Sequence, residues 1–358
     1  MYPALAAAEA LARTHPGVSL HFVGSGGLER EIVRESGVAF ATYDDVRGGP
    51  VAGVSAMRRA ASAVQLAAGT AQAWGLLGRR RPRAVLLTGG WSSLPVALAA
   101  WARRVPVLIY LPDVEPGASI RLLRRFARRV ALTVPESAAF FHEGQTVVTG
   151  YPLRCAVTKA TREAGLAHFA LDAGRPTLLV FGGSRGARSL NRALLAAAPD
   201  LLADGVQIVH ITGSLDWTEV EAARAALAAQ GVDVTRYRAY PYLHCEMGLA
   251  LAAADLAVSR AGASVLGEFP LFGLPSVLVP YPHAWRYQRV NADYLASRGA
   301  ALVLDDERLG DQLLPTVRGL LAAPDRLAHM RQRAAALARL DGAARLALEL
   351  VHLAGETR

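Results

Sequence analysis

Short apolar segments that alternate with helical segments restrict the fold of this chain more than any other feature. In the first half, apolar strands are expected at 18–23, 84–88, 106–110, 130–134 and 146–149, with helices around 93–102 and 118–128. The pattern restarts at Pro176, with strands expected at 177–181, 206–211, 234–240, 256–258 and 276–279. Buried parallel strands joined by crossover helices have this pattern. We therefore expect an α/β fold built from two Rossmann-like, doubly wound domains.

The boundary between the two domains is expected in the segment from Gly150 to Arg175. A turn at Asp341-Gly342 would let the final helix leave the second domain and return to the first. We therefore expect an N-terminal domain formed by 1–157 with 341–358, and a C-terminal domain formed by 158–340.

The chain begins directly on an alanine-rich helix at 4–14. A doubly wound sheet normally has its first strand at the centre, and the loop after that strand is a major ligand loop. Either the first domain is built differently, or the given sequence starts after a strand and a glycine-rich loop. Because the rest of this block is regular, we favour the second interpretation.

Composition excludes several classes of protein. The 358 residues are 52% hydrophobic, which favours a large core over disorder. The two cysteines, Cys155 and Cys245, do not form a disulfide framework or a zinc motif. Apolar runs fall short of the ~20 residues that span a bilayer.

The net charge of +9 comes mainly from arginine, which clusters at 79–83 and again at 121–129. Solvated helix faces would explain these clusters, and so would binding to an anionic membrane surface. Nucleic acid is the weaker interpretation, because the sequence has no helix-turn-helix, zinc or aromatic RNA-binding signature.

The stretch from Asp255 to Asn291 carries the clearest chemistry. An apolar strand is followed by the small-residue turn 259–264 and then by a helix that contains Glu268. A strand, glycine turn and helix start present free backbone N–H groups to an anion. A carboxylate beside a phosphate site is unfavourable unless it accepts hydrogen bonds, for example from sugar hydroxyls. A nucleotide sugar offers both phosphates and hydroxyls.

Three other glycine turns follow predicted strands. The turn 182–188 has the sequence GGSRGAR and opens a helix, and its arginines favour an anion over a purely structural turn. The turn 88–93 is the equivalent in the first domain, where a structural role is equally plausible. For Gly24–Gly27 a structural role is favoured.

The sequence gives little support for a metal site or for a catalytic nucleophile. Asp44-Asp45 and Asp305-Asp306 lack the Asp-x-Asp spacing that holds a diphosphate through a metal, so we interpret them as loop and helix-cap acids. His244 and His283 are more typical of hydrogen-bonding or packing residues. The sequence has no nucleophile elbow or metal-binding helix. Positioning and stabilisation of a leaving diphosphate remain as the source of catalysis.

The combination of these motifs resembles the MurG family of UDP-GlcNAc transferases, which convert lipid I to lipid II in peptidoglycan synthesis. The resemblance covers nearly the whole chain. The segments that carry it are 2–11, 22–31, 86–101, 147–154, 182–191, 259–268 and 273–291.

This resemblance implies a GT-B fold with its active site in the cleft between the domains. It also implies an inverting hexosyltransferase that requires no metal or other cofactor. The second domain would bind UDP-GlcNAc, and the first would bind undecaprenyl-pyrophosphoryl-MurNAc-pentapeptide (lipid I).

The resemblance also assigns residues to the substrates. The diphosphate would lie at Gly183 and Ser184, and Glu268 would hold the ribose. The residues expected around the rest of the donor are Arg154, His244, Arg260, Gly262, Ala263, Ser264, Gln288 and Asn291. Gly89 and Gly90 would contact the acceptor diphosphate.

Three departures from the family pattern leave alternatives open. The family's glycine-rich loop with its candidate base histidine would precede Met1, which leaves the catalytic base unknown. Tyr287 replaces a family glutamine. The segment 110–113 reads YLPD where the family has His-Glu-Gln-Asn, so Asp113 is a weak candidate for the base. A different GT-B transferase for glycolipids or natural products, or an inactive truncated paralogue that only binds UDP-sugar, remains possible. A nicotinamide dehydrogenase fits less well, because neither glycine turn matches the dinucleotide fingerprint.

The family resemblance places the chain on the cytoplasmic face of the cell membrane as a peripheral protein. A candidate membrane patch combines basic and apolar residues, namely Arg58, Arg59, Arg79–Arg81, Trp74, Leu76 and Leu77. An apolar stripe that faces the core would explain the same pattern.

Overall fold

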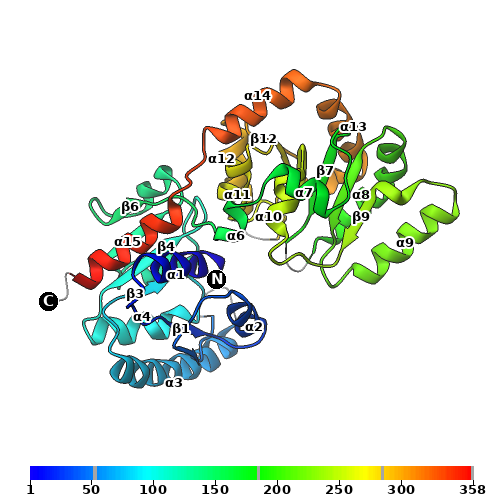
Figure 1. The fold of residues 1–358 in the computed structure, drawn as a ribbon. Coiled ribbons are helices and arrows are strands. Elements are labelled where there is room, and N and C mark those ends of the chain that lie inside the picture. Colours follow the sequence, from blue (N-terminus) through cyan, green and yellow to red (C-terminus); the bar gives the residue numbers. More distant parts are fainter. Residues whose placement is uncertain (51–54, 184–185, 284–285, 356–358) are drawn as a thin grey trace. The chain divides into compact units, whose positions relative to one another are not determined.

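The computed structural model describes residues 1–50, 55–183, 186–283 and 286–355, with the backbone alone for residues 28 and 56–60. The chain divides into two compact units (Figure 1). Unit 1 comprises Met1–Cys155 and Leu340–Arg358, and unit 2 comprises Ala156–Arg339. These limits lie close to the domain limits expected from the sequence.

Unit 1 contains two parallel sheets. The smaller pairs β1 (His21–Gly24) with β2 (Thr42–Asp45), and the larger has the order β3-β4-β5-β6. Its strands are β3 (Val85–Leu87), β4 (Val107–Leu111), β5 (Arg129–Leu132) and β6 (Thr146–Val148). The intervening helices are α2 (Leu28–Glu35), α3 (Ala56–Arg80), α4 (Ser93–Ala102), α5 (Ala118–Leu123) and the 3₁₀ helix η1 (Pro135–Phe140).

The centre of the larger sheet of unit 1 is buried because helices cover it. All five residues of β4 are buried, as expected for a parallel strand with both faces covered. Helix α4 buries Leu94, Val96 and Ala97, and its long neighbour α3 packs on it through Ala73 and Leu77. This core fixes the loops at the carboxyl ends of β3 and β4.

The two ends of the chain meet in unit 1. Helix α1 (Tyr2–Thr14) is rich in alanine, which has the highest helix propensity, and Pro3 suits its first turn. Its buried Leu11 packs with Ala347 of α15 (Gly342–Gly355), and Figure 1 shows these two helices side by side. The Glu9 carboxylate accepts a hydrogen bond from the Cys155 backbone N–H at 2.9 Å, which fastens α1 to the end of the unit.

Unit 2 has one parallel sheet of six strands in the order β12-β11-β10-β7-β8-β9. The strands are β7 (Thr177–Phe181), β8 (Gln207–Ile211), β9 (Tyr237–Tyr240), β10 (Leu256–Ser259), β11 (Ser276–Leu278) and β12 (Ala301–Val303). The main helices are α7 (Arg162–His168), α8 (Arg188–Ala203), α9 (Trp217–Ala229), α10 (Met247–Ala253), α11 (Val265–Phe272), α12 (Tyr287–Ala296), α13 (Leu309–Leu321) and α14 (Pro324–Ala335). The short elements are α6 (Cys155–Thr158) and the 3₁₀ helices η2 (Val234–Arg236) and η3 (Asp306–Arg308).

Strand β7 lies at the point where the strand order of unit 2 reverses. After β7 the chain adds β8 and β9 on one side, and then returns to place β10, β11 and β12 on the other. In doubly wound sheets, ligands bind outside the carboxyl ends of the strands at such a switch point. The loops after β7 and β10 are therefore the expected place for a ligand in unit 2.

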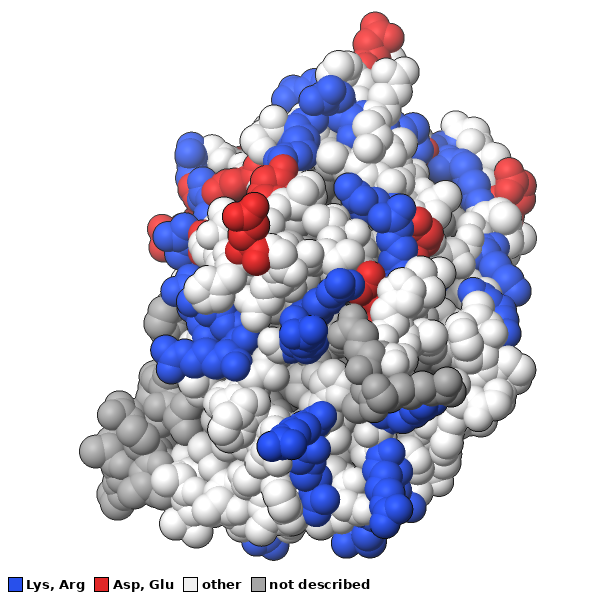
Figure 2. Space-filling model, turned by 90° about the vertical axis from the view of Figure 1, so that its left-hand side faces the viewer, with Lys and Arg blue, Asp and Glu red and all other residues white. Residues whose placement is uncertain are grey.

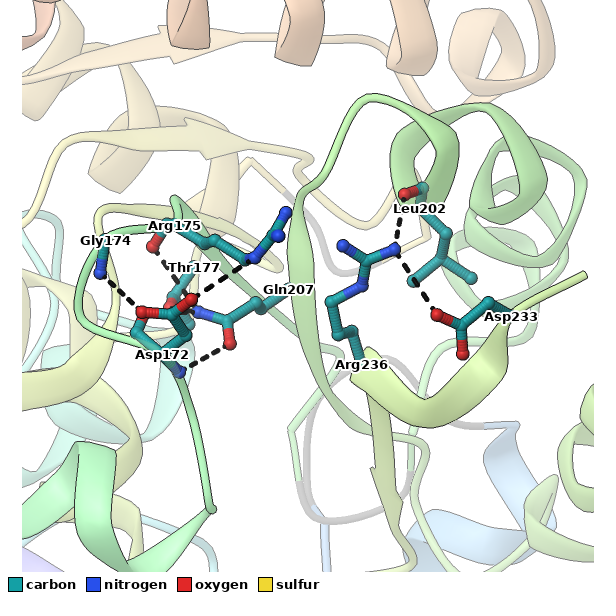
Figure 3. Close-up of polar contacts among 8 residues, drawn as sticks. All are labelled: Asp172, Gly174, Arg175, Thr177, Leu202, Gln207, Asp233 and Arg236. Atoms are coloured by element: carbon teal, nitrogen blue, oxygen red, sulfur yellow. Dashed lines mark hydrogen bonds and ion pairs between the residues drawn. The ribbon is translucent and has the colours of Figure 1, made fainter.

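Polar contacts close the opposite, amino edge of this sheet (Figure 3). The buried Gln207 side chain accepts a hydrogen bond from Asp172 N–H at 2.7 Å and donates one to the Asp172 carbonyl at 2.8 Å. Nearby, Arg236 donates to the Leu202 carbonyl at 3.3 Å and pairs with Asp233. These contacts satisfy buried backbone groups and leave the carboxyl edge for function.

Several elements differ from the sequence expectation. Strands β2 and β12 and helix α12 were not expected, because β12 has only three residues and β2 carries two acids. The helix expected at 118–128 ends at Leu123. Within the described residues no strand pairs with both β1 and β3, so unit 1 has two separate sheets where one doubly wound sheet was expected.

Candidate functional site

Two glycine turns lie side by side at the switch point of unit 2. Strands β7 and β10 are paired in parallel, with Phe181 opposite Ser259 at their carboxyl ends. The turn 182–187 follows β7 and opens α8, while the turn 260–264 follows β10 and opens α11. Both helices therefore point their amino ends toward the same edge of the sheet, where backbone N–H groups favour an anion.

The turn 182–187 is shaped by its glycines. A Cβ on Gly186 would lie 2.2 Å from the Thr212 carbonyl oxygen, so only glycine permits this close contact. Gly183 has a φ of +92°, and a Cβ there would meet no atom within 4 Å. Ala187, at the N-cap of α8, has no side chain that accepts a hydrogen bond. The predicted site residue Ser184 lies outside the described residues, as does Arg185.

The turn 260–264 has a similar opening. Ser264 lies at the N-cap of α11 without a side-chain capping hydrogen bond, and a Cβ on Gly262 would meet no atom within 4 Å. Ala263 lies between them and is half-buried. Glu268 is half-buried in the first turn of α11, as predicted from its spacing. A carboxylate is thus placed one helical turn from the open backbone.

Arg260 is engaged inside unit 2. Its side chain is 8% exposed and its guanidinium pairs with Asp306 at 2.5 Å. It also donates to the Ser189 hydroxyl at 2.8 Å and to the Val279 carbonyl at 3.2 Å, and it lies over the ring of Tyr281. The guanidinium therefore joins loops around the predicted nucleotide site.

Gln288 and Asn291 are the predicted sugar contacts, and their surroundings in the structure differ. The side-chain oxygen Oε1 of Gln288 accepts a hydrogen bond from Tyr281 N–H at 2.9 Å, and the residue is half-buried. Asn291 is fully buried and donates to the Ala261 carbonyl at 3.1 Å. In this structure Asn291 supports the turn 260–264, and its contact with a sugar stays a prediction.

A buried network holds the first turn of α8 from the other side. Asp216 accepts hydrogen bonds from Arg188 Nε at 3.0 Å and from Asn191 Nδ2 at 3.0 Å. Asn191 Oδ1 meets His210 Nε2 at 2.9 Å, and His210 Nδ1 meets the Tyr237 hydroxyl at 2.9 Å. Burial lowers the pKa of His210 to about 3. The histidine is therefore neutral, with Nε2 donating and Nδ1 accepting.

The two remaining predicted donor residues, His244 and Arg154, belong to other elements. His244 is exposed on the loop after the edge strand β9, where its ring meets Tyr242 edge-on. Arg154 belongs to unit 1, where its guanidinium lies over the ring of Tyr2.

In unit 1 the carboxyl ends of β3 and β4 bring Gly89, Gly90 and Asp113 to one edge. Both glycines have positive φ, and the Gly90 N–H donates to the Ser119 hydroxyl at 3.3 Å. Asp113 is half-buried on the loop after β4. Tyr110, which precedes it, is fully buried and its hydroxyl bonds to Thr133 at 2.6 Å, so Tyr110 is a core residue.

The expected membrane patch is partly wrong. Leu76 and Leu77 are buried in the core of unit 1, while Trp74 is 45% exposed and Arg79–Arg81 are exposed. The side chains of Arg58 and Arg59 lie outside the described residues. No helix in the described part of the chain is long and apolar enough to cross a membrane.

The paired acids have charged partners. Asp44 and Asp45 lie in β2, not in a loop, and pair with Arg80 and Arg30 respectively. Asp305 is the N-cap residue of η3 but makes no side-chain capping hydrogen bond. Among the described residues, no group of three or more His, Cys, Asp or Glu could hold a metal ion.

Two domain models of one glycosyltransferase family match most of the chain. Residues 1–132 match the glycosyltransferase family 28 N-terminal domain, and residues 177–346 match the family 28 C-terminal domain. The structure of Acinetobacter baumannii MurG superimposes with a TM-score of 0.72 at 23% identity, covering 98% of this chain and 95% of that one. The protein thus has the two-domain GT-B fold, which confirms the predicted fold class.

Curated relatives specify the family. The chain is 40% identical to a UDP-N-acetylglucosamine--N-acetylmuramyl-(pentapeptide) pyrophosphoryl-undecaprenol N-acetylglucosamine transferase of Roseiflexus sp. (strain RS-1), over 94% of this chain and 84% of the relative. It is also 40% identical to the enzyme of that name from Moorella thermoacetica, over 95% and 92%. The chain therefore belongs to the family of these transferases, the MurG family, as its motifs predicted.

Sequence reasoning missed the residues that hold the turns in place. Asp306 was interpreted as a capping acid, and Asp216 and His210 were not singled out. Their partners lie far along the chain, so no local pattern marks them. The sequence offers one signal for the two acids. Asp216 follows the predicted strand β8 and Asp306 follows the short strand β12, at the edge of the sheet where helices begin.

Proposed function

We propose that this chain transfers N-acetylglucosamine from UDP-GlcNAc to the C4 hydroxyl of the N-acetylmuramyl sugar of lipid I, which forms lipid II. The observation that carries the proposal is the pair of open glycine turns after β7 and β10, at the switch point of unit 2. The names of the curated relatives supply the two substrates.

Unit 2 provides the donor half of this reaction. The first turns of α8 and α11 direct N–H groups and the positive ends of two helix dipoles at the diphosphate. Glu268 accepts hydrogen bonds from the ribose hydroxyls, and Gln288 binds the GlcNAc. Asn291 and Arg260 act behind this surface.

The chemistry is a single displacement with inversion. The acceptor C4 oxygen attacks the anomeric carbon while the bond from that carbon to the diphosphate oxygen breaks. UDP leaves with the bonding electrons, and the proton of the attacking hydroxyl passes to a base. Preorganised N–H groups stabilise the charge that develops on the leaving diphosphate, so this proposal uses no metal or other cofactor.

Unit 1 provides the acceptor half. The backbone at Gly89 and Gly90 faces the acceptor diphosphate, with the Ser119 hydroxyl bracing Gly90. Asp113 is the available candidate for the base, because it lies on the adjacent loop after β4. A carboxylate is a weak base for a sugar hydroxyl, so the contribution of Asp113 is expected to be modest.

Attachment to the membrane would be peripheral and through unit 1. A pocket of about 750 Å³ lies at the amino ends of β4 and β5, opposite the edge that carries Gly89 and Asp113. Two aromatic rings and three arginines contribute to its lining, namely Trp101, Phe126, Arg104, Arg125 and Arg128. Trp101 is 62% exposed. Such a surface suits anionic headgroups with the aromatic ring at the interface.

Basic side chains are spread widely over the protein, and Figure 2 shows them across the face that it draws. We define the aromatic–arginine patch as Trp74, Trp101, Arg103, Arg104, Arg125 and Arg128. Arg103 belongs to it because its guanidinium lies 4.1 Å from the centroid of the Trp74 ring. This patch replaces Leu76 and Leu77 of the earlier expectation with exposed rings.

The proposed reaction is tested by incubating the full-length chain with UDP-GlcNAc and a soluble lipid I analogue. We expect UDP release that depends on the acceptor, and one disaccharide product per UDP. Glu268→Gln should raise KM for UDP-GlcNAc about tenfold, because a lost charged hydrogen bond costs about 1.5 kcal/mol. Glu221→Gln, which alters another half-buried carboxylate, on α9, is the matched control and should leave KM unchanged.

Two results would contradict the proposal. UDP release that is equal with and without acceptor would indicate hydrolysis only. Transfer to glycolipid acceptors but not to the lipid I analogue would favour a different GT-B transferase.

A further inference from the structure

Asp306 occupies an unusual place for an acidic residue. It lies in η3, just after the edge strand β12, and its side chain is only 17% exposed. Its Oδ1 pairs with the guanidinium of Arg260 at 2.5 Å and accepts a hydrogen bond from the Ser189 hydroxyl at 2.7 Å. Ser189 in turn accepts from Arg260 at 2.8 Å. Three side chains thus form a closed triangle of hydrogen bonds.

The triangle connects loops at the carboxyl ends of four strands. Ser189 belongs to the first turn of α8, after β7, and Arg260 directly follows β10. Asp306 follows β12, and the Val279 carbonyl that accepts from Arg260 follows β11. The two glycine turns at the switch point are therefore joined to each other through one buried guanidinium.

The neighbouring acid has a different environment. Asp305 pairs with Arg289 at 2.9 Å, but both side chains are more than half exposed. Exposed pairs of this kind contribute little to stability or geometry. Asp305 and Asp306 are adjacent and have the same chemistry, so they form a matched pair in which only one carboxylate reaches the glycine turns.

We propose that Asp306 is a positioning residue for the donor diphosphate, acting through Arg260 and Ser189. This inference rests on the proposed function, in which the first turns of α8 and α11 bind the diphosphate. Without the carboxylate, Arg260 loses its counter-charge in a buried place and Ser189 loses its acceptor. The guanidinium would then turn toward water or toward other acceptors, and the spacing between the two helix starts would change.

Such a change should affect donor binding more than the chemical step. The backbone N–H groups of both turns must reach one diphosphate together, and a displacement of about 1 Å can cost up to a hundredfold in rate or affinity. The side chains of Asp306 and Ser189 are not expected to touch the donor, so the reacting atoms keep their environment once the donor is bound.

The test compares Asp306→Asn with Asp305→Asn in the full-length chain, using calorimetric titration with UDP and steady-state kinetics with a lipid I analogue. We expect Asp306→Asn to weaken UDP binding and raise KM for UDP-GlcNAc at least tenfold, with kcat changed less than threefold. Asp305→Asn should match the wild type. A merely structural role would lower the melting temperature and the active fraction while leaving KM and the UDP affinity of the folded protein unchanged.

Ser189→Ala provides a second variant that keeps the ion pair and removes only the bridging hydroxyl. It should raise KM for UDP-GlcNAc about threefold. Equal UDP affinity and KM in the wild type and all three variants would overturn the inference while leaving the proposed function intact. Failure of the wild type itself to bind UDP would overturn the proposed donor site, and this inference with it.

Discussion

His210 links a buried side chain to the start of α8. It lies in β8, is fully buried, and bonds to Tyr237 on one side and to Asn191 on the other. Asn191 in turn donates hydrogen bonds to Asp216 and to the Thr212 carbonyl, which lie beside the glycine turn. Burial in a low dielectric opposes the charge that a doubly protonated imidazole would carry.

The stability of unit 2 should therefore depend on pH. The pKa of His210 is about 3 in the folded protein and about 6.5 in the unfolded chain. The unfolded state binds the extra proton, so stability falls as pH drops below 6.5 and continues to fall toward 3. Between pH 6.5 and 4.5 this group should account for about 2 kcal/mol of lost stability.

Urea unfolding of the wild type and of His210→Gln, at pH 6.5 and 4.5, measures that contribution. Glutamine has no titration in this range, so the variant should lose about 2 kcal/mol less between the two pH values, whatever its absolute stability. Identical losses would mean that His210 does not titrate with the pKa that its burial implies.

At the scale of elements, the two turns at the switch point depend on glycine for different reasons. Gly186 is restricted by contact with the Thr212 carbonyl, while Gly183 has the same left-handed backbone in open space. Gly231, after α9, also has a positive φ of +88° and open surroundings, but it lies at the amino edge of the sheet. Substitution of these three glycines can therefore distinguish the effects of backbone strain, packing and ligand contact.

Substitution of each glycine by alanine should give three different results. Gly231→Ala should cost about 1 kcal/mol of stability from backbone strain alone and leave UDP binding unchanged. Gly183→Ala should cost the same stability but weaken UDP binding, because its methyl group occupies the open side of the turn. Gly186→Ala should lose about 2 kcal/mol more stability than Gly231→Ala, because its methyl group meets backbone.

Thermal unfolding and UDP titration of the three variants check these values. If Gly183→Ala binds UDP like Gly231→Ala, the open side of the turn does not face the diphosphate. If Gly186→Ala is no less stable than Gly231→Ala, the contact with Thr212 is not tight.

Much of the architecture at this scale could be predicted from the sequence. The strands β7 and β10 and the helices after them are marked by buried apolar runs that end in glycine, which is a local signal. Strand β12 and helix α12 lacked such a signal, because the strand is short and the helix follows a polar loop. The burial of Asn291 and the pairing of Arg260 depend on Ala261 and Asp306, whose approach only the folded sheet determines.

At the scale of the whole molecule, the net charge of +9 can serve a function only where positive side chains gather on the surface. Many arginines pair with acids inside their own unit, as Arg129 does with Glu349 and Arg318 with Asp200. The aromatic–arginine patch has three arginines that line one pocket with the exposed Trp101, and its Arg103 lies over the ring of the exposed Trp74. Its place opposite the carboxyl edge of the sheet keeps it separate from Gly89 and Asp113.

Vesicle flotation tests the aromatic–arginine patch. The double variant Arg125→Gln with Arg128→Gln should bind phosphatidylglycerol vesicles about 30-fold more weakly than the wild type, at about 1 kcal/mol per arginine near the surface. Neutralising Arg192 and Arg318 in unit 2 is the matched control and should have a much smaller effect. Unchanged binding by the patch variant would place the membrane contact elsewhere.

The paired turns after β7 and β10 are proposed to bind the donor. A crystal structure of the full-length chain with UDP-GlcNAc tests it most directly. We predict the diphosphate within hydrogen-bonding distance of backbone N–H groups in the first turns of both α8 and α11, with a ribose hydroxyl on Glu268. A nucleotide bound at another edge of unit 2, or in unit 1 alone, would contradict the account.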